Sequence, residues 1–414
     1  MKTKIEIILK EIISIIHKEQ YSGNRHDIGE DVLFALNYSF DTTIKNNEYS
    51  KAAYDLITSV IDRIWERLNI GCWKDVPEYL RSVYAFASFL KAISLLQFTL
   101  QDVDENIEKN LKHSLKVLDK GLLLGNSLRT ELSQTASSLC ALLYSFSKSS
   151  NSELDSFYQL KNIQNEVKSA SMLKTCVLSS IVCPSIELFH VNYFKKHIPV
   201  KLTGCINHWP ALQKWYNINY IFEKVGPRLV PVEIGSSYTS SNWSQKLMTI
   251  RYFIENFIIS SEKKQIGYLA QHQLFNQIPE LLDDIREPEY CVLSEDYVNS
   301  IGTDMNVWFG PANTVSPLHY DPKHNLLAQI VGSKRVYLID PLLSKNLYSY
   351  DDTLLFNTSQ VDLENPDYQK FPKLKNIKIF ECHLEPGDML YIPPKWWHHV
   401  RSLSASFSVS FWWN

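Results

Sequence analysis

Cysteine frameworks, strong net charge and uninterrupted apolar runs are all missing from this sequence. The seven cysteines are scattered without a Cys-x-x-Cys pair, which favours reduced thiols over a disulfide scaffold. The net charge is only −3, so nothing predicts long-range attraction to nucleic acid or an anionic membrane. The apolar run at residues 5–16 is interrupted by charges, which argues against a signal peptide or spanning helix. We therefore expect a protein of the nucleus or cytosol with no direct nucleic-acid or membrane partner.

Proline is nearly absent from the first part of the chain. All of its seventeen prolines except Pro77 lie at or after Pro184. Proline interrupts helices but is tolerated in turns and loops, and 414 residues exceed the usual size of a single core. We predict a helical domain at residues 1–170, joined through a polar linker at 149–170 to a β-rich domain at 171–414.

Apolar residues recur at three- and four-residue spacing in the first domain. Runs at 54–68, 83–100, 111–124 and 132–146 predict a stack of about six to eight antiparallel helices. Gly71, Gly121 and Gly125 are expected where helices end. The sequence shows no convincing fixed-period repeat, so tetratricopeptide-like stacking remains only an alternative. This domain is expected to serve as a scaffold or as the docking surface for a partner protein.

From residue 306 onward, short strands and turns alternate at the spacing of a barrel or sandwich. The last strand is the clearest, because Phe407, Val409 and Phe411 alternate with serines. One of its faces is apolar and the other is small and polar, as a barrel wall requires. The expected fold class is α+β, with the helical region preceding the barrel.

Residues 314–325, TVSPLHYDPKHN, place His319 and Asp321 two positions apart in a segment that reads as strand. Alternate side chains of a strand share a face, so the imidazole and the carboxylate should point into one space. A further ligand is available downstream, where His398 and His399 should face opposite sides of an extended backbone. Two histidines and one carboxylate form the facial triad of non-haem Fe(II) oxygenases. His-x-Asp alone is weak evidence, because such residues also pair simply to satisfy hydrogen bonds.

Several stretches of the second half resemble the JmjC-domain family of 2-oxoglutarate oxygenases. They are IGSSYTSSNWSQKLMT, GYLAQHQLFNQIPEL, WFGP, SPLHYDP, FNTSQVDLENPD, LEPGDMLYIPPKWWHHVR and SFSVSFWW. The resemblance runs from about residue 183 to the C-terminus. Over the helical part only the arrangement is similar, namely a helical region before the JmjC domain.

This resemblance implies a double-stranded β-helix barrel of the cupin type that uses Fe(II), 2-oxoglutarate and O2. The iron ligands that it implies are His319, Asp321 and His398, since the family's Trp-His arrangement matches Trp397-His398. His399 is then a packing or supporting residue. Lys334 matches the family's lysine for the distal carboxylate of 2-oxoglutarate, a charge-assisted contact. The other residues implied to bind 2-oxoglutarate are Asn325, Ser316 and Tyr268.

Four further residues match family positions that hold the guanidinium of a substrate arginine: Glu233, Tyr238, Gln271 and Trp308. A carboxylate accepts a bidentate guanidinium and an aromatic face stacks on it. The resemblance therefore implies hydroxylation of arginine side chains in protein substrates. The alternative for Glu233 is pairing with one of the chain's own arginines.

Two alternative functions stay open. One is demethylation of methyl-lysine in histones by the same iron site, and the other is a non-catalytic interaction protein with a relic barrel. The resemblance also implies a chromatin-regulating role in the nucleus, with the cytoplasm as a second location.

Overall fold

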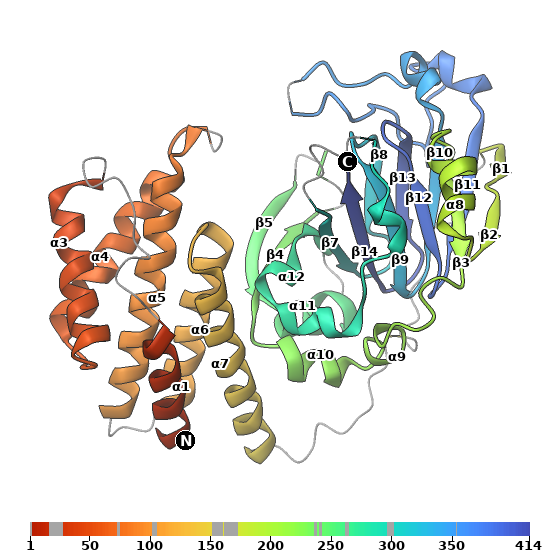
Figure 1. Ribbon diagram of the computed structural model, residues 1–414. Helices are drawn as coiled ribbons and strands as arrows, with labels where there is room; N and C mark the ends of the chain where they lie inside the picture. The colour runs from red at the N-terminus through yellow and green to blue at the C-terminus, as the bar shows by residue number, and fades with distance from the viewer. Residues whose placement is uncertain are drawn as a thin grey trace.

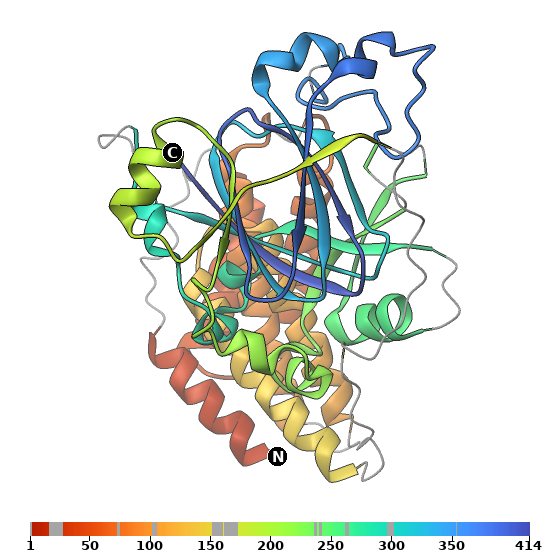
Figure 2. The same cartoon turned by 90° about the vertical axis from the view of Figure 1, so that its right-hand side faces the viewer.

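A helical domain and a β-rich domain lie side by side in the computed structural model (Figure 1). It describes residues 2–15, 28–72, 75–101, 106–150, 160, 173–235, 238–239, 242–260, 265–295, 302–352 and 354–414. Figure 2 shows the β-rich domain in front of the helices. The proposed linker lies outside the described residues, apart from Leu160 and the last two residues of the helix that ends at Ser150. The boundary near residue 170 therefore stays a prediction.

The helical domain is a bundle around the apolar helix α5. Its described elements are α1 (Lys2–Ile15), α3 (Glu30–Phe40), the π-helical turn η2 (Asp41–Lys45), α4 (Lys51–Leu68), α5 (Glu78–Gln101), α6 (Ile107–Leu124) and α7 (Arg129–Ser150). Among the described residues, α5 alone is long and apolar enough to cross a membrane, but 83% of that apolar window is buried inside the protein. Such burial is typical of a core helix.

Gly121 is not at a helix end. Gly71 and Gly125 lie just past the ends of α4 and α6, as expected, whereas Gly121 lies within α6. A Cβ atom at this position would lie 2.9 Å from the Cβ of Ser88 on α5. Glycine is therefore needed there for the close packing of two helices, and the prediction of a helix stop was wrong.

The β-rich domain contains two sheets that form the double-stranded β-helix, so the expected α+β class is confirmed. The smaller sheet has the order β1 (Thr175–Val177), β11 (Ile379–Leu384), β10 (Lys334–Ile339), β13 (Trp397–Ser402), β8 (Val315–His319). The larger has the order β2 (Ser180–Val182), β3 (Val200–Thr203), β12 (Met389–Ile392), β9 (His324–Val331), β14 (Ser406–Trp413), β7 (Asp304–Gly310), β6 (Gly267–His272), β4 (Leu229–Ile234), β5 (Ser244–Thr249).

Short helices complete this domain. They are α8 (Ile186–Phe189), η5 (His190–Phe194), α9 (Ala211–Lys214), α10 (Ile218–Val225), α11 (Ile250–Phe253), η6 (Ile254–Ile259), α12 (Leu274–Gln277), η7 (Pro279–Asp284), η8 (Glu289–Val292), η9 (Pro341–Asn346) and η10 (Pro372–Asn376). Helices α9 to α12 pack near the outer face of the larger sheet (Figure 1).

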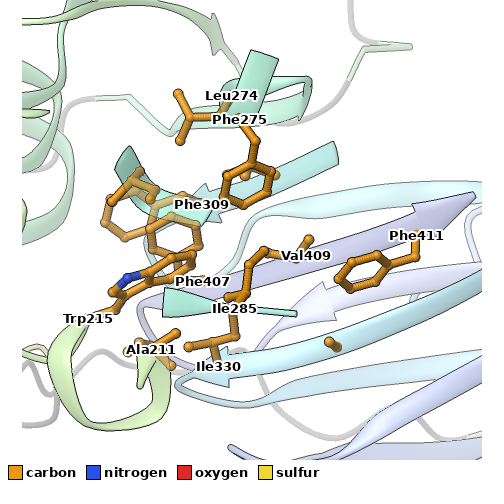
Figure 3. Packing of buried hydrophobic residues seen from close by; sticks show 14 of the residues in the cluster. Ala211, Trp215, Leu274, Phe275, Ile285, Phe309, Ile330, Phe407, Val409 and Phe411 are labelled. Atoms are coloured by element: carbon orange, nitrogen blue, oxygen red, sulfur yellow. The ribbon is translucent and has the colours of Figure 1, made fainter. Parts of the chain in front are cut away.

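The apolar face of β14 is the outer face of the barrel wall. Phe407 stacks 4.5 Å from Phe309 and lies 4.5 Å from Trp215, measured between ring centroids. Figure 3 shows these rings with some of the other side chains of the same core. The serine face points the opposite way, and Ser410 Oγ accepts a hydrogen bond of 2.9 Å from Trp308 Nε1. The interior of the barrel is therefore the polar side of the strand, where a site can form.

A buried ion pair joins the two domains. Asp119 of α6 and Arg228, which precedes β4, have fully buried side chains 2.9 Å apart. The other oxygen of Asp119 accepts the backbone N–H of Leu229 at 2.7 Å, and Gln277 of α12 donates to the same carboxylate at 2.9 Å. A buried charge pair needs such additional hydrogen bonds to offset its desolvation. These contacts fix the position of α6 against the barrel.

Candidate functional site

Two neighbouring strands bring His319 and His398 together inside the barrel. His319 ends β8, and His398 is its register partner on β13. Their ring centroids are 4.2 Å apart. The Nδ1 atoms lie 2.7 and 2.9 Å from the backbone oxygens of Pro317 and Trp396. Because these carbonyls accept Nδ1–H, both Nε2 atoms are free to bind a metal.

Asp321 lies beyond the strand and not on it. The expectation of a His-x-Asp pair within one strand was wrong, because β8 ends at His319. Pro322 follows and has no N–H for a ladder. The backbone oxygen of Asp321 instead accepts the N–H of Lys395 at 2.7 Å. Its Oδ2 lies 3.5 Å from His398 Nε2, and the ligand atoms of all three residues lie within 4.8 Å of one another.

The chemistry of these three side chains fits a divalent metal. Asp321 Oδ2 is buried and has no hydrogen-bond partner. Burial, followed by the neighbouring His319, lowers the pKa of His398 to about 4. The imidazole is therefore neutral, which is the form that binds metals. A bound cation would satisfy the free carboxylate oxygen.

His399 lies on the opposite side of β13 from the triad. Its ring borders a separate pocket with Glu364 and Arg401, and Arg401 forms an ion pair with Glu364. Burial lowers the pKa of His399 to about 4, so this ring is neutral as well. The tertiary structure thus brings His398, and not its neighbour, to the candidate metal centre.

The residues predicted for 2-oxoglutarate line the same pocket as the triad: Ser316, Asn325, Lys334 and Tyr268. Lys334 is only 1% exposed, and its Nζ donates to Tyr268 Oη at 3.2 Å. No ion pair among the described residues involves Lys334. Burial lowers its pKa to about 7, because the ammonium has no opposite charge beside it. A carboxylate of 2-oxoglutarate would provide that charge, so this pocket fits the co-substrate.

Asn325 and Trp412 offer two more unused polar groups to this pocket. Asn325 Oδ1 and Trp412 Nε1 are buried without a hydrogen-bond partner. Trp412 is not among the predicted site residues, because the sequence favoured a packing role for it, although the strand pattern contains the signal. It continues the alternation of Ser408 and Ser410, which is the inward face of β14. The apolar part of the lining comes from Leu327, Ile392 and Val400.

Glu233 carries a half-buried carboxylate near the pocket. It lies on β4, opposite Tyr268 of β6. Burial raises its pKa, while a hydrogen bond with Trp243 acts in the other direction. In the part of the chain that the structure describes, no ion pair contains Glu233. The alternative pairing with one of the chain's own arginines is therefore not seen among those residues.

Tyr238 and Trp308 lie at the same end of the barrel. Tyr238 Oη is 3.3 Å from Thr358 Oγ1. Burial raises the pKa of Tyr238 to about 12, and the nearby charges of Asp321 and Glu233 act in the same direction. Trp308 lines the metal pocket itself. Tyr238 thus reaches the neighbourhood of the triad through Thr358, which pairs with His319.

Gln271 is placed differently from the other three residues predicted for the substrate. It is exposed, with a φ of 46°, at an irregularity in the pairing of β6 with β7. No hydrogen bond between described residues links it to Glu233 or Tyr238. Its assignment to the substrate site stays a prediction.

Comparisons with known proteins agree with this geometry. Residues 186–414 match the model of the Cupin-like domain family. The chain is 41% identical over 357 residues to "Lysine-specific demethylase 8" of Danio rerio, and the match covers 86% of each chain. It is 40% identical over 362 residues to "Jumonji C domain-containing protein 5" of Drosophila melanogaster, covering 86% of each. It is 38% identical to "Lysine-specific demethylase JMJ30" of Arabidopsis thaliana, covering 85% of this chain and 84% of the relative.

Proposed function

The chain belongs to the JmjC family of cupin-like proteins, and from that premise we propose that it hydroxylates arginine side chains in protein substrates. The coarser class follows from the family, whose oxygenases depend on Fe(II), 2-oxoglutarate and O2. The family alone does not identify the side chain that is modified, so that assignment rests on the residues of this site.

Each group of residues has a distinct part in this proposal. His319, Asp321 and His398 would hold Fe(II), which would let O2 place one oxygen atom in the succinate formed from 2-oxoglutarate, with release of CO2, and the other in a substrate C–H bond. Lys334 would pair with the distal carboxylate of 2-oxoglutarate. The buried walls around these residues exclude water from the reacting atoms.

The observation that carries the proposal is the half-buried carboxylate of Glu233, which has no ion-pair partner among the described residues. Its raised pKa shows that burial disfavours the charged form in the absence of a cation. A guanidinium would restore the balance with two parallel N–H···O bonds, whereas a methylated ammonium offers fewer N–H donors. This difference favours arginine over methyl-lysine.

Demethylation of methyl-lysine is the second candidate, and the names of the relatives favour it. Two of the three relatives above are called lysine-specific demethylases. The same site would then hydroxylate an N-methyl group, and the resulting hemiaminal would release formaldehyde. A non-catalytic role is disfavoured, because burying the ammonium of Lys334 without an opposite charge has a free-energy cost that a bound carboxylate would offset.

Mass spectrometry separates the two reactions. Arginine peptides and methyl-lysine peptides are incubated with Fe(II), 2-oxoglutarate and ascorbate, using the wild-type chain and a His319→Ala control. We expect one added oxygen atom on arginine, absent in the control. Loss of methyl groups without any oxygen gained on arginine would instead establish the demethylase.

The variant Glu233→Gln tests the role of the carboxylate. Loss of a charge-assisted contact worth roughly 1.5–3 kcal/mol should lower kcat/KM for arginine peptides about 10- to 100-fold. Any turnover of methyl-lysine peptides should change little. An equal loss on both substrates would contradict the assignment of Glu233 to a guanidinium.

A further inference from the structure

A second group of two histidines and a carboxylate lies outside the iron pocket. It consists of His197, which follows η5, Glu295, which follows η8, and His324, which begins β9. Their ligand atoms all lie within 4.8 Å of one another, and His197 Nε2 is 2.6 Å from Glu295 Oε1. Asn325, the next residue of β9, lines the iron pocket. Neighbouring residues of a strand project to opposite faces, so His324 points away from that pocket.

The buried member of this group is held in one orientation. His324 is 2% exposed, and its ring stacks on Phe194 with centroids 4.3 Å apart. Trp413 stacks with the same ring at 5.4 Å. His324 Nδ1 lies 2.8 Å from Tyr391 Oη, which leaves Nε2 as the free nitrogen. Metal-binding histidines typically use the second ring nitrogen in this way.

The segments that carry the other two side chains are also anchored. His197 has a φ of 50°, in the left-handed region that residues other than glycine seldom adopt. Its N–H donates to Phe194 O at 3.0 Å, and its own carbonyl accepts from Trp396 Nε1 at 2.8 Å. Near Glu295, the carbonyl of Leu293 accepts from Trp413 Nε1 at 2.6 Å. Both segments are thus fixed to the aromatic groups that surround His324.

An ordinary surface pair in the same chain provides the contrast. His383 Nε2 and Glu381 Oε1 are 2.9 Å apart, with the histidine side chain 55% exposed. Among the described residues, that pair belongs to no group of three metal-binding side chains. The His197–Glu295 pair differs because a third side chain, the buried imidazole of His324, completes it. A hydrogen-bonded pair needs only two side chains, whereas three metal-binding side chains converge here.

We propose that His197, Glu295 and His324 bind a Zn²⁺ ion at a site separate from the iron centre. Two imidazoles and one carboxylate suit Zn²⁺, and the exposure of His197 and Glu295 leaves room for water as a fourth ligand. The ion would join segments that are far apart in the sequence to the start of β9. In contrast to the iron pocket, no buried lysine lies among these ligands, so the site has no group for a dicarboxylate co-substrate.

Zinc stoichiometry in the full-length chain tests this site. The iron centre is first removed with His319→Ala and His398→Ala, and the protein is stripped with a chelator, reloaded with Zn²⁺ and gel-filtered. Elemental analysis should find one zinc per chain. Adding Glu295→Gln should weaken zinc binding by at least about tenfold, whereas adding His383→Gln should leave it unchanged.

Two further readouts keep the test decisive. Glu295 is an exposed side chain, so Glu295→Gln should fold normally and report on the ligand alone, while His324→Gln checks the buried donor. Zinc should raise the Tm of the chain that carries only His319→Ala and His398→Ala. It should not raise the Tm once Glu295→Gln is added. The proposed site would be overturned if the chain with His319→Ala and His398→Ala bound no zinc. It would also be overturned if the added Glu295→Gln variant retained zinc equally well. Neither result depends on arginine hydroxylation, so the two proposals fail separately.

Discussion

Replacing Lys334 with methionine is the sharpest test of the co-substrate pocket. The variant Lys334→Met keeps an unbranched side chain of similar length but removes the ammonium. In the wild-type chain, that ammonium is 1% exposed and donates only to a phenol, Tyr268. The substitution therefore removes an unpaired buried charge from the free protein and a paired charge from the complex with 2-oxoglutarate. It should have opposite effects on stability and on binding.

The effect on stability follows from the pKa. Burial lowers the pKa of Lys334 from 10.5 to about 7, which corresponds to a free-energy penalty on the order of 5 kcal/mol for the charged form. The unfolded chain binds more protons than the folded chain between these two values, so wild-type stability rises with pH across that window. Below about pH 7 the full penalty is present. Lys334→Met should remove it, making the free variant more stable than the wild type by a few kcal/mol at pH 6.

The effect on binding has the opposite sign. A lost charge-assisted contact of roughly 1.5–3 kcal/mol should raise the Kd for 2-oxoglutarate about 10- to 100-fold. In the wild type, a bound carboxylate restores the charged lysine, so binding above about pH 7 takes up nearly one proton. The affinity should therefore fall about tenfold per pH unit above that value. This pH dependence should be lost in the variant.

Calorimetry with Mn²⁺ in place of Fe(II) measures binding without turnover, and buffers of different ionisation enthalpy count the protons taken up. Urea unfolding at several pH values measures stability. Lys345→Met, at an exposed position, is the matched control and should change neither quantity. A variant that binds 2-oxoglutarate within about twofold of the wild type would refute the assignment, because a contact of this kind is worth more. Wild-type stability that stays flat between pH 7 and 10, relative to the variant, would refute the burial argument.

Two further predictions concern the metal and the domain interface. His398→Gln should abolish iron binding and turnover, whereas His399→Gln should retain the metal. Elemental analysis of the two variants measures their iron content, and an equal loss of iron from both would contradict the assignment of His398 as the ligand. Asp119→Ala should lower the free energy of unfolding by about 3–5 kcal/mol, because it leaves the Arg228 charge buried and unpaired. Urea denaturation measures this loss. Asp55→Ala, which breaks an exposed pair, should change stability little, and similar losses in both variants would count against the buried ion pair.

Local patterns in the sequence were sufficient to predict a helical domain, a β-rich domain and part of the candidate site. The alternation in β14 correctly identified a barrel wall, because side chains of a strand project to opposite faces. The same periodicity cannot say which face is inside. Only the packing of Phe407 and Phe411 under the short helices shows that the serine face lines the barrel. The position of Trp412 in the pocket follows from that packing.

The choice between adjacent histidines shows the same limit. Extended backbone places His398 and His399 on opposite sides, but the register of β13 against β8 decides which one meets His319. The His-x-Asp spacing was informative for a different reason from the one expected. Asp321 reaches the site from beyond the strand, because β8 ends at His319 and a hydrogen bond from the N–H of Lys395 positions the backbone of Asp321.

The sequence by itself determined the helical and β-rich halves, the likeness to an oxygenase family, and the residue types for a metal and a dicarboxylate. Only the tertiary structure decided the burial and missing counter-charge of Lys334, the ion pair between Asp119 and Arg228, and the meeting of His197, Glu295 and His324. The physical reason is the distance along the chain over which each kind of information acts. Helical and strand periodicity act between residues a few positions apart, whereas these charges and ligands come from segments brought together only when the sheets and helices pack.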